Sequence, residues 1–125
     1  RLKPLTVLEA KLLASAPLGE EACGFEAGAE IDLAQVGEAQ EVRAALLEWL
    51  VTVPACQGLI HRKGVQLRGA KVTGGLDLQD ARVDYPLTLQ KCVFEEKMVL
   101  ERGEFHYLDF SGSQVKGISA EGIKI

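Results

Sequence analysis

An apolar or small residue returns at every fifth or sixth position through the second half of this chain. The steps alternate between five and six up to Leu100 and are five afterwards, in the series Leu67, Val72, Leu78, Val83, Leu89, Phe94, Leu100, Phe105, Phe110, Val115, Ala120 and Ile125. Amphipathic helices repeat their apolar residues every three or four positions, and strands every two. A longer fixed step indicates short segments that each turn a corner before the next begins, which is typical of a stacked repeat architecture.

A second column of mostly apolar or small residues lies two positions before the first. Its members are Val65, Ala70, Leu76, Ala81, Leu87, Cys92, Met98, Gly103, Leu108, Ser113, Ile118 and Ile123. Residues two apart on an extended segment point to the same side, so each segment is expected to present two side chains to an interior. Polar residues take outward positions between them, among them Arg68, Lys71, Gln79, Arg82, Gln90 and Glu101.

Several units pair a small residue with a larger apolar residue two positions later: Ala70-Lys71-Val72, Ala81-Arg82-Val83, Cys92-Val93-Phe94, Gly103-Glu104-Phe105 and Ser113-Gln114-Val115. They resemble the pentapeptide-repeat family, whose unit is a small residue, a variable one, a central Leu or Phe, and two more. The resemblance implies a mainly β fold: a right-handed, four-sided pentapeptide-repeat β-helix with one unit on each side. Four steps lead from Leu67 to Leu89 and four more to Phe110, so residues 57–125 are expected to form about three coils.

Residues one coil apart are expected to stack inside such a β-helix, because protein interiors are closely packed. The four expected stacks are Leu67 with Leu89 and Phe110, Val72 with Phe94 and Val115, Leu78 with Leu100 and Ala120, and Val83 with Phe105 and Ile125.

Residues 1–56 are expected to form a helical N-terminal cap. Helices are predicted over 5–16 and 39–52, separated by a loop with one short strand near 31–33. Thr6 and Glu9 have the spacing of a capping box at the start of the first helix. Trp49 falls on the apolar stripe of the second helix and is predicted to be a core anchor. That helix is expected to cover the open end of the first coil.

The order of the segments after residue 41 also resembles a group of bacterial pentapeptide-type proteins with no established activity. The helix at 42–47 is followed by His61-Arg62-Lys63-Gly64-Val65 and then by Gly69-Ala70-Lys71-Val72-Thr73-Gly74. Repeats in that group usually continue further, so the chain is interpreted as an N-terminal fragment or as a protein whose last coil has an open edge. Such an edge is expected to pair with a partner chain or a second copy.

The charge distribution argues against a mimic of DNA. Residues 1–56 hold four Lys and Arg against nine Asp and Glu, whereas residues 57–125 hold ten against nine, and the whole chain carries −4. Some members of the resembled family mimic duplex DNA and bind type II topoisomerases, which requires a negative surface along the coil because DNA carries a phosphate charge about every 1.7 Å. The repeat half is close to neutral, which disfavours topoisomerase binding.

The cysteines and the hydropathy pattern indicate a cytoplasmic protein. The three cysteines, Cys23, Cys56 and Cys92, are an odd set without metal-like spacing, so a disulfide framework is not expected. Cys92 occupies a small inward position, where a thiol packs like an apolar group. No segment resembles a signal peptide or a membrane span, and neither membrane nor nucleic-acid binding is predicted.

Histidines and carboxylates do not form a recognisable site in the sequence. His61 and His106 are the two histidines and lie about two coils apart, whereas zinc needs several converging ligands. Asp77, Asp80 and Asp84 could be read as paired carboxylates for acid–base chemistry, but the outward positions of a solenoid are expected to be flat and solvated. They are interpreted as surface charges.

The remaining motifs are also better explained by structural roles than by catalysis or ligand binding. Gly74-Gly75-Leu76-Asp77-Leu78-Gln79-Asp80 faintly resembles calcium-binding β-roll repeats, but no second copy follows, and the glycines are assigned to a corner. Ser111 and Ser113 lack a His–Asp pair, and His61-Arg62-Lys63 is too short for a nucleic-acid stripe. No catalytic, cofactor-binding or metal-binding residue is therefore assigned, and no cofactor is expected.

Three functions follow from this reading. The leading hypothesis is a non-catalytic scaffold that binds another protein, with self-association through the open C-terminal coil as a further expectation. The alternatives are binding to or protection of a type II topoisomerase, and an enzyme whose site lies at the junction of helix and repeat near His61, Arg62 and Lys63.

Overall fold

The structure is a computed structural model that describes residues 4–26, 30–52 and 60–125. These residues form two α-helices, α1 (Val7–Ser15) and α2 (Ala44–Thr52), and short 3₁₀ turns at Ala16–Leu18, Leu33–Gln35 and Glu38–Gln40. They also form nine strands: β1 (Glu21–Cys23), β2 (Glu41–Arg43), β3 (Val65–Arg68), β4 (Lys71–Thr73), β5 (Arg82–Gln90), β6 (Val93–Phe94), β7 (Met98–Val99), β8 (Glu104–Asp109) and β9 (Ile118–Ser119).

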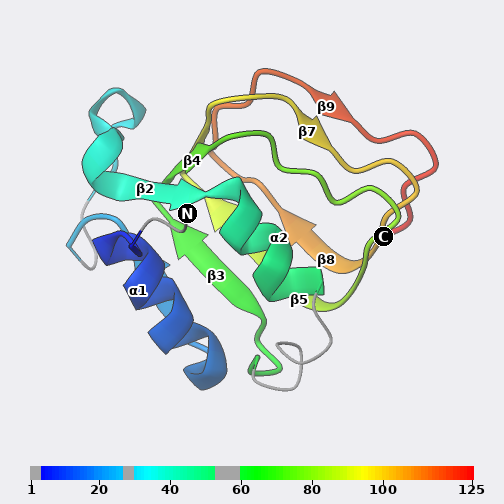
Figure 1. The fold of residues 1–125 in the computed structure, drawn as a ribbon, viewed down its shortest axis with the longest axis horizontal. Coiled ribbons are helices and arrows are strands. Elements are labelled where there is room, and N and C mark those ends of the chain that lie inside the picture. The colour runs from blue at the N-terminus through cyan, green and yellow to red at the C-terminus, as the bar shows by residue number, and fades with distance from the viewer. Residues whose placement is uncertain (1–3, 27–29, 53–59) are drawn as a thin grey trace.

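The strands build three parallel sheets, with the orders β1-β3-β5-β8, β2-β4-β6 and β7-β9. Figure 1 shows α1 beside β2 and β3, and α2 in the middle of the view, where it contacts β2 and β5. Strand partners lie far apart in sequence: Leu67 pairs with Leu89, Val72 with Phe94 and Val83 with Phe105. These three predicted neighbour pairs are confirmed.

The predicted fold class, a mainly β, right-handed, four-sided β-helix with a helical cap, is wrong. The described residues have mixed α and β content, with strands in three separate parallel sheets and no closed solenoid. Two strands, β1 and β2, come from the segment predicted to be helical, and they lie at the ends of two of the sheets. The expected division near residue 56 lies outside the described residues.

The course of β5 explains why four sides are not formed. A corner was expected between Val83 and Leu89, yet β5 runs through this stretch as one strand of nine residues. Its buried residues are Val83, Tyr85, Leu87 and Leu89, which is the simple alternation of a strand with one buried face. Two of the expected sides therefore merge into one sheet.

The division into inward and outward residues is confirmed over most of the repeat. Both predicted columns are buried from Val65 to Phe105, except that Ala81 is only half-buried. From Leu108 onward the corresponding side chains are half-buried or exposed, and Phe110 meets Phe94 edge to face with ring centroids 5.9 Å apart. The buried residues form one core that also includes Leu8 and Leu12 of α1.

Corners of the stack recur where the backbone takes positive φ. One set consists of Gly69, Lys91 and Gly112, and the other of Asp80, Arg102 and Gly122. Only glycine adopts this conformation without steric cost. The predicted corner at the Gly74-Gly75 pair is present too, with φ +80° at Gly74.

Both predicted helices exist, but their boundaries and exposed faces differ from expectation. The capping box of α1 is confirmed, with Glu9 N–H donating to Thr6 Oγ1 and Thr6 N–H to Glu9 Oε1. The second helix begins at Ala44 rather than 39, because the residues before it form a 3₁₀ turn and β2. The prediction of a strand near 31–33 is wrong, because the strand between the two helices that precedes β2 is β1, at Glu21–Cys23. Trp49 is not a core anchor: its side chain is 49% exposed.

Candidate functional site

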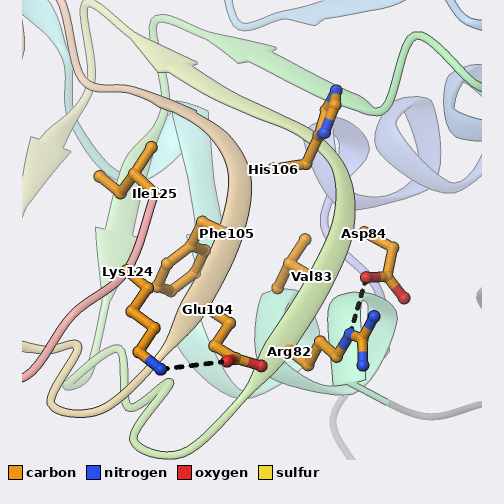
Figure 2. Close-up of a pocket in the computed structure, with 8 residues that line it drawn as sticks. All are labelled: Arg82, Val83, Asp84, Glu104, Phe105, His106, Lys124 and Ile125. Atoms are coloured by element: carbon orange, nitrogen blue, oxygen red, sulfur yellow. Dashed lines mark hydrogen bonds and ion pairs between the residues drawn. The ribbon is translucent and has the colours of Figure 1, made fainter.

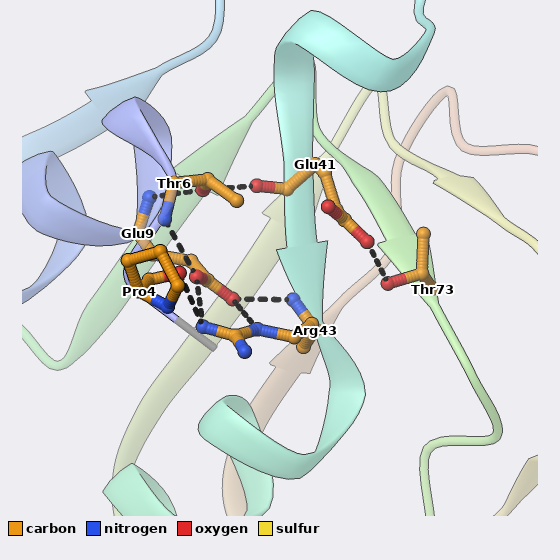
Figure 3. Close-up of polar contacts among 6 residues, drawn as sticks. All are labelled: Pro4, Thr6, Glu9, Glu41, Arg43 and Thr73. Carbon is orange, nitrogen blue, oxygen red and sulfur yellow. Dashed lines mark hydrogen bonds and ion pairs between the residues drawn. The ribbon is translucent and has the colours of Figure 1, made fainter. Parts of the chain in front are cut away.

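A polar cluster joins α1, β2 and β4 at one edge of the fold (Figure 3). Glu9 is fully buried, and its carboxylate forms an ion pair with Arg43, whose Nη2 lies 2.8 Å from Oε1. The Arg43 backbone N–H also donates to Glu9 Oε2 at 2.8 Å. On the other side of β2, Thr73 Oγ1 donates to Glu41 Oε2 at 2.8 Å. The cluster therefore ties three elements together across the start of β2.

The protonation of Glu9 is strongly biased by these contacts. Burial raises the pKa of its carboxyl, but hydrogen bonds from the Arg43 side chain and from the Arg43 and Thr6 backbones outweigh burial and lower the pKa to about 2. A carboxylate held by this many donors stays ionised at neutral pH. It cannot act as a general base near pH 7, where a base with a pKa close to the working pH is needed.

A shallow groove lies between α2 and the end of β4. Its walls include Ala44, Ala45 and Glu48 from α2 and Gly74 and Gly75 from the following turn. Four of its lining residues are small, namely Ala44, Ala45, Gly74 and Gly75, and Glu41, Arg43 and Thr73 line it as well. The Glu48 carboxylate is engaged there, since Oε1 accepts the Asp77 N–H at 2.6 Å.

Trp49 lies on α2 one helical turn beyond Ala45, which lines this groove. Residues four apart share a helix face. The opposite face of α2 is buried through Ala44, Leu47, Leu50 and Val51. The indole therefore faces away from the core, with about half of its surface exposed.

A second open groove runs along the first half of β5 and β8 (Figure 2). Charged side chains line it in two pairs, Arg82 with Asp84 at 2.9 Å and Lys124 with Glu104 at 3.9 Å. All four are well exposed. Exposed pairs of this kind contribute little to stability, and they present both signs of charge to solvent rather than a field of one sign.

The two histidines lie in separate surroundings and do not share a site. His61 Nδ1 accepts the Lys63 N–H at 3.1 Å in a local turn, and its imidazole packs against Gly19. His106 is exposed on β8 and lines the groove of Figure 2. Arg62 and Lys63 are exposed. The junction that was considered for an enzyme thus places a hydrogen-bonded, half-buried imidazole beside two solvated cations.

The three carboxylates considered for acid–base chemistry have separate local partners. Asp77 Oδ1 accepts the Gln79 N–H, and Asp84 pairs with Arg82. Asp80 is held by Arg102, whose Nε lies 2.8 Å from Oδ1, and this hydrogen bond lowers the pKa of the Asp80 carboxyl. The structure does not bring them together as a pair of catalytic acids.

The two serines are engaged in turns and packing. Ser111 Oγ and N–H both donate to Asp109. Ser113 Oγ donates to Leu89 O at 2.8 Å and accepts the Cys92 N–H at 3.0 Å. Within the described ranges, no group of three or more His, Cys, Asp or Glu side chains is placed to hold a metal ion.

Cys92 lies in the core, as predicted for a small inward position. It is fully buried, and burial, opposed by weaker backbone hydrogen bonds, raises the pKa of its thiol to about 12. Cys23 is half-buried, and both thiols are free. Cys56 lies outside the described residues.

The structure gives Glu9 and Trp49 roles that the sequence pattern does not predict. Glu9 was recognised only as a capping residue, and its pairing with Arg43 depends on a contact across 34 positions. A sequence signal for Trp49 did exist: Ala44, Leu47, Leu50 and Val51 alone form a sufficient apolar stripe, which leaves Trp49 outside it.

No protein-family model, no curated protein and no solved structure matches this chain. Across the described segments, no helix is long and apolar enough to cross a membrane.

Proposed function

We propose that this chain is a non-catalytic protein-interaction module whose contact surface is the outer face of α2, with Trp49 as its anchor and the groove lined by Ala45 and Glu48 of the same helix as its second part. The observation that carries the proposal is the half-exposed indole on a helix whose opposite face is anchored in the core. Tryptophan is enriched at the centres of protein interfaces, where a large rigid side chain buries much area at low entropic cost.

The composition of the groove supports binding rather than chemistry. Its small residues allow a partner's backbone or side chain to approach closely, and its polar groups already have internal partners. Glu41 accepts from Thr73, Glu48 accepts from Asp77, and Arg43 is held by Glu9. A nucleophile or acid–base catalyst needs a free, suitably tuned group at the reacting atoms, whereas a docking surface needs shape and an apolar anchor.

The test is recovery of partners from native lysate on the immobilised chain, compared with two matched variants. Trp49→Ala removes the proposed anchor, and Tyr107→Ala removes an aromatic side chain of equal exposure, 49%, on β8. We expect Trp49→Ala to lose a partner that the unmodified chain and Tyr107→Ala both retain. Equal recovery by all three, or no partner for any of them, would contradict the proposal.

Fluorescence adds a readout that does not depend on capture. Trp49 is the single tryptophan of the chain, so its emission reports on this surface alone. Adding a purified partner is expected to shift the emission to the blue and to protect the indole from acrylamide. A partner that binds without changing either signal docks elsewhere.

We further propose a cytoplasmic setting and a relation to the pentapeptide-repeat family. Free thiols at Cys23 and Cys92 support a reducing compartment, and the quoted five-residue units support the relation. The topoisomerase and enzyme alternatives stay predictions from sequence, because the described residues add no observation in favour of either.

A further inference from the structure

Strand β2 is the first strand of the sheet β2-β4-β6 and has β4 on one side only. An edge strand with free backbone groups is a template for pairing with another chain. Whether another strand can extend this sheet therefore depends on the backbone N–H and C=O groups of β2 that point away from β4.

Side chains of α1 occupy the outward backbone groups of β2 (Figure 3). Thr6 Oγ1 donates to Glu41 O at 2.6 Å, and Glu9 Oε2 accepts the Arg43 N–H at 2.8 Å. The Glu41 N–H is used locally, by Glu38 O of the preceding 3₁₀ turn. One outward acceptor, Glu41 O, and one outward donor, the Arg43 N–H, are thus taken by residues 6–9, the N-cap and first turn of α1, which we call the cap turn.

We propose that the cap turn closes the β2 edge against self-association, and that the strand it excludes is β2 of a second copy. The two groups that the cap turn covers are Glu41 O and Arg43 N–H. In an antiparallel pair with a twofold axis at Val42, Glu41 of one copy lies opposite Arg43 of the other. Each Arg43 N–H then donates to the opposite Glu41 O, so both covered groups find partners.

The side chains favour the same arrangement. Directly opposed residues of an antiparallel pair interact on one face, and opposite charges there are stabilising. The twofold pairing places Glu41 against Arg43 twice. Removing Glu9 takes away the buried carboxylate that now holds the Arg43 guanidinium, which also donates to Pro4 O at 3.2 Å. The inference is independent of the surface proposed around Trp49.

The test compares a variant that can no longer cover Glu41 O and the Arg43 N–H with one that still can. Thr6→Ala/Glu9→Ala removes the hydroxyl and the carboxylate, whereas Thr6→Ser/Glu9→Gln keeps a hydroxyl and an acceptor oxygen. Sedimentation velocity over a wide concentration range gives the dimer dissociation constant. We expect the first variant to dimerise about tenfold more tightly than the unmodified chain, and the second to behave like the unmodified chain.

Two further measurements connect any dimer to the β2 edge. Adding Glu41→Lys to the double-alanine variant opposes like charges twice and should weaken its dimer about tenfold. Hydrogen exchange at the Arg43 amide should slow as the concentration of that variant rises. A folded double-alanine variant that sediments like the unmodified chain, or a dimer indifferent to Glu41→Lys, would overturn the proposal.

Circular dichroism establishes whether the double-alanine variant is folded. If it is not, Glu9→Ala alone removes the side-chain acceptor of the Arg43 N–H while keeping the Thr6 hydroxyl. Exchange at Arg43 that slows with concentration then supports the proposal, and exchange independent of concentration overturns it.

Discussion

Glu9 and Arg43 lie 34 positions apart and form a bidentate ion pair, with Arg43 Nε and Nη2 at 2.9 and 2.8 Å from the two carboxylate oxygens of Glu9. The carboxylate is fully buried, and the guanidinium is 28% exposed at the rim. This pair fixes α1 to the end of β2 and satisfies an outward amide of the edge strand in the same contact.

Removing the Glu9 carboxylate is expected to destabilise the fold. Glu9→Ala removes the carboxylate that neutralises the partly buried Arg43 guanidinium, which costs about 3 kcal/mol in the free energy of unfolding. The matched control is Asp84→Ala, which breaks the exposed pair with Arg82 and should cost less than about 1 kcal/mol. Urea unfolding at low protein concentration measures both, and equal costs would contradict the distinction between the two pairs.

Acid should weaken the fold through Glu9. Its pKa is about 2 in the folded chain and near 4.5 ordinarily, so the unfolded chain takes up a proton more readily. The ionised pair contributes its full stability above about pH 4.5 and loses it as the pH falls towards 2, a change of about 3 kcal/mol. Glu9→Gln should flatten this part of the pH profile of unfolding. A profile unchanged by Glu9→Gln would show that other carboxylates cause the acid sensitivity.

The thiol of Cys92 should be unreactive in the folded protein. Burial raises its pKa to about 12, and only the thiolate reacts with alkylating reagents. At pH 8 we expect iodoacetamide to modify Cys92 only on unfolding, at a rate that rises with denaturant, and the half-buried Cys23 to react first. Peptide mapping by mass spectrometry distinguishes the two. Equal rates in native buffer would place Cys92 outside the core.

Gly64 should not tolerate a side chain. Its φ is +81°, and a Cβ atom would lie 1.8 Å from Pro86 O, so Gly64→Ala is expected to cost at least about 3 kcal/mol. Gly37 is the control, because its backbone is extended and no atom lies within 4 Å of a Cβ there. Gly37→Ala should be neutral or slightly stabilising. Thermal melts of both variants test the contrast, which a mild Gly64→Ala would refute.

The exposure of Trp49 can be measured without a partner. In the isolated chain we expect its emission to be that of a solvated indole, quenched readily by acrylamide. Trp49→Ala should cost less than about 1 kcal/mol, whereas Leu47→Ala, on the buried face of the same helix, should cost about 2 to 5 kcal/mol. A large loss on Trp49→Ala would restore its predicted role as a core anchor.

Much of the local structure could be predicted from the residues alone. The capping box at Thr6 and Glu9 depends on neighbours three apart, and the inward columns from Val65 to Phe105 depend on the regular return of apolar residues. The register that places Leu67 beside Leu89 follows from the same spacing. These features are determined over short distances or by a repeat, so no knowledge of distant contacts is needed.

The number of sides could not be predicted from the spacing of one column. A step of six residues is compatible both with a corner and with an extended strand, and the alternation of Val83, Tyr85, Leu87 and Leu89 favours the strand. Whether a corner or a strand forms depends on the strand that pairs with this segment. Strand β8 pairs with both the first and the second half of β5, with a shift in register between Val83 and Pro86. The pairing of β5 with β8 therefore determined that the strands form three sheets rather than a four-sided coil.

The amino-acid sequence by itself determined which side chains are buried in the repeat and where the first helix begins, because both follow from patterns of near neighbours. Only the tertiary structure decided that Glu9 meets Arg43, that β2 forms a covered edge, and that Trp49 faces outward. Each of these depends on segments far apart in the chain competing for the same core or the same backbone groups, and spacing along one segment carries no information about that competition.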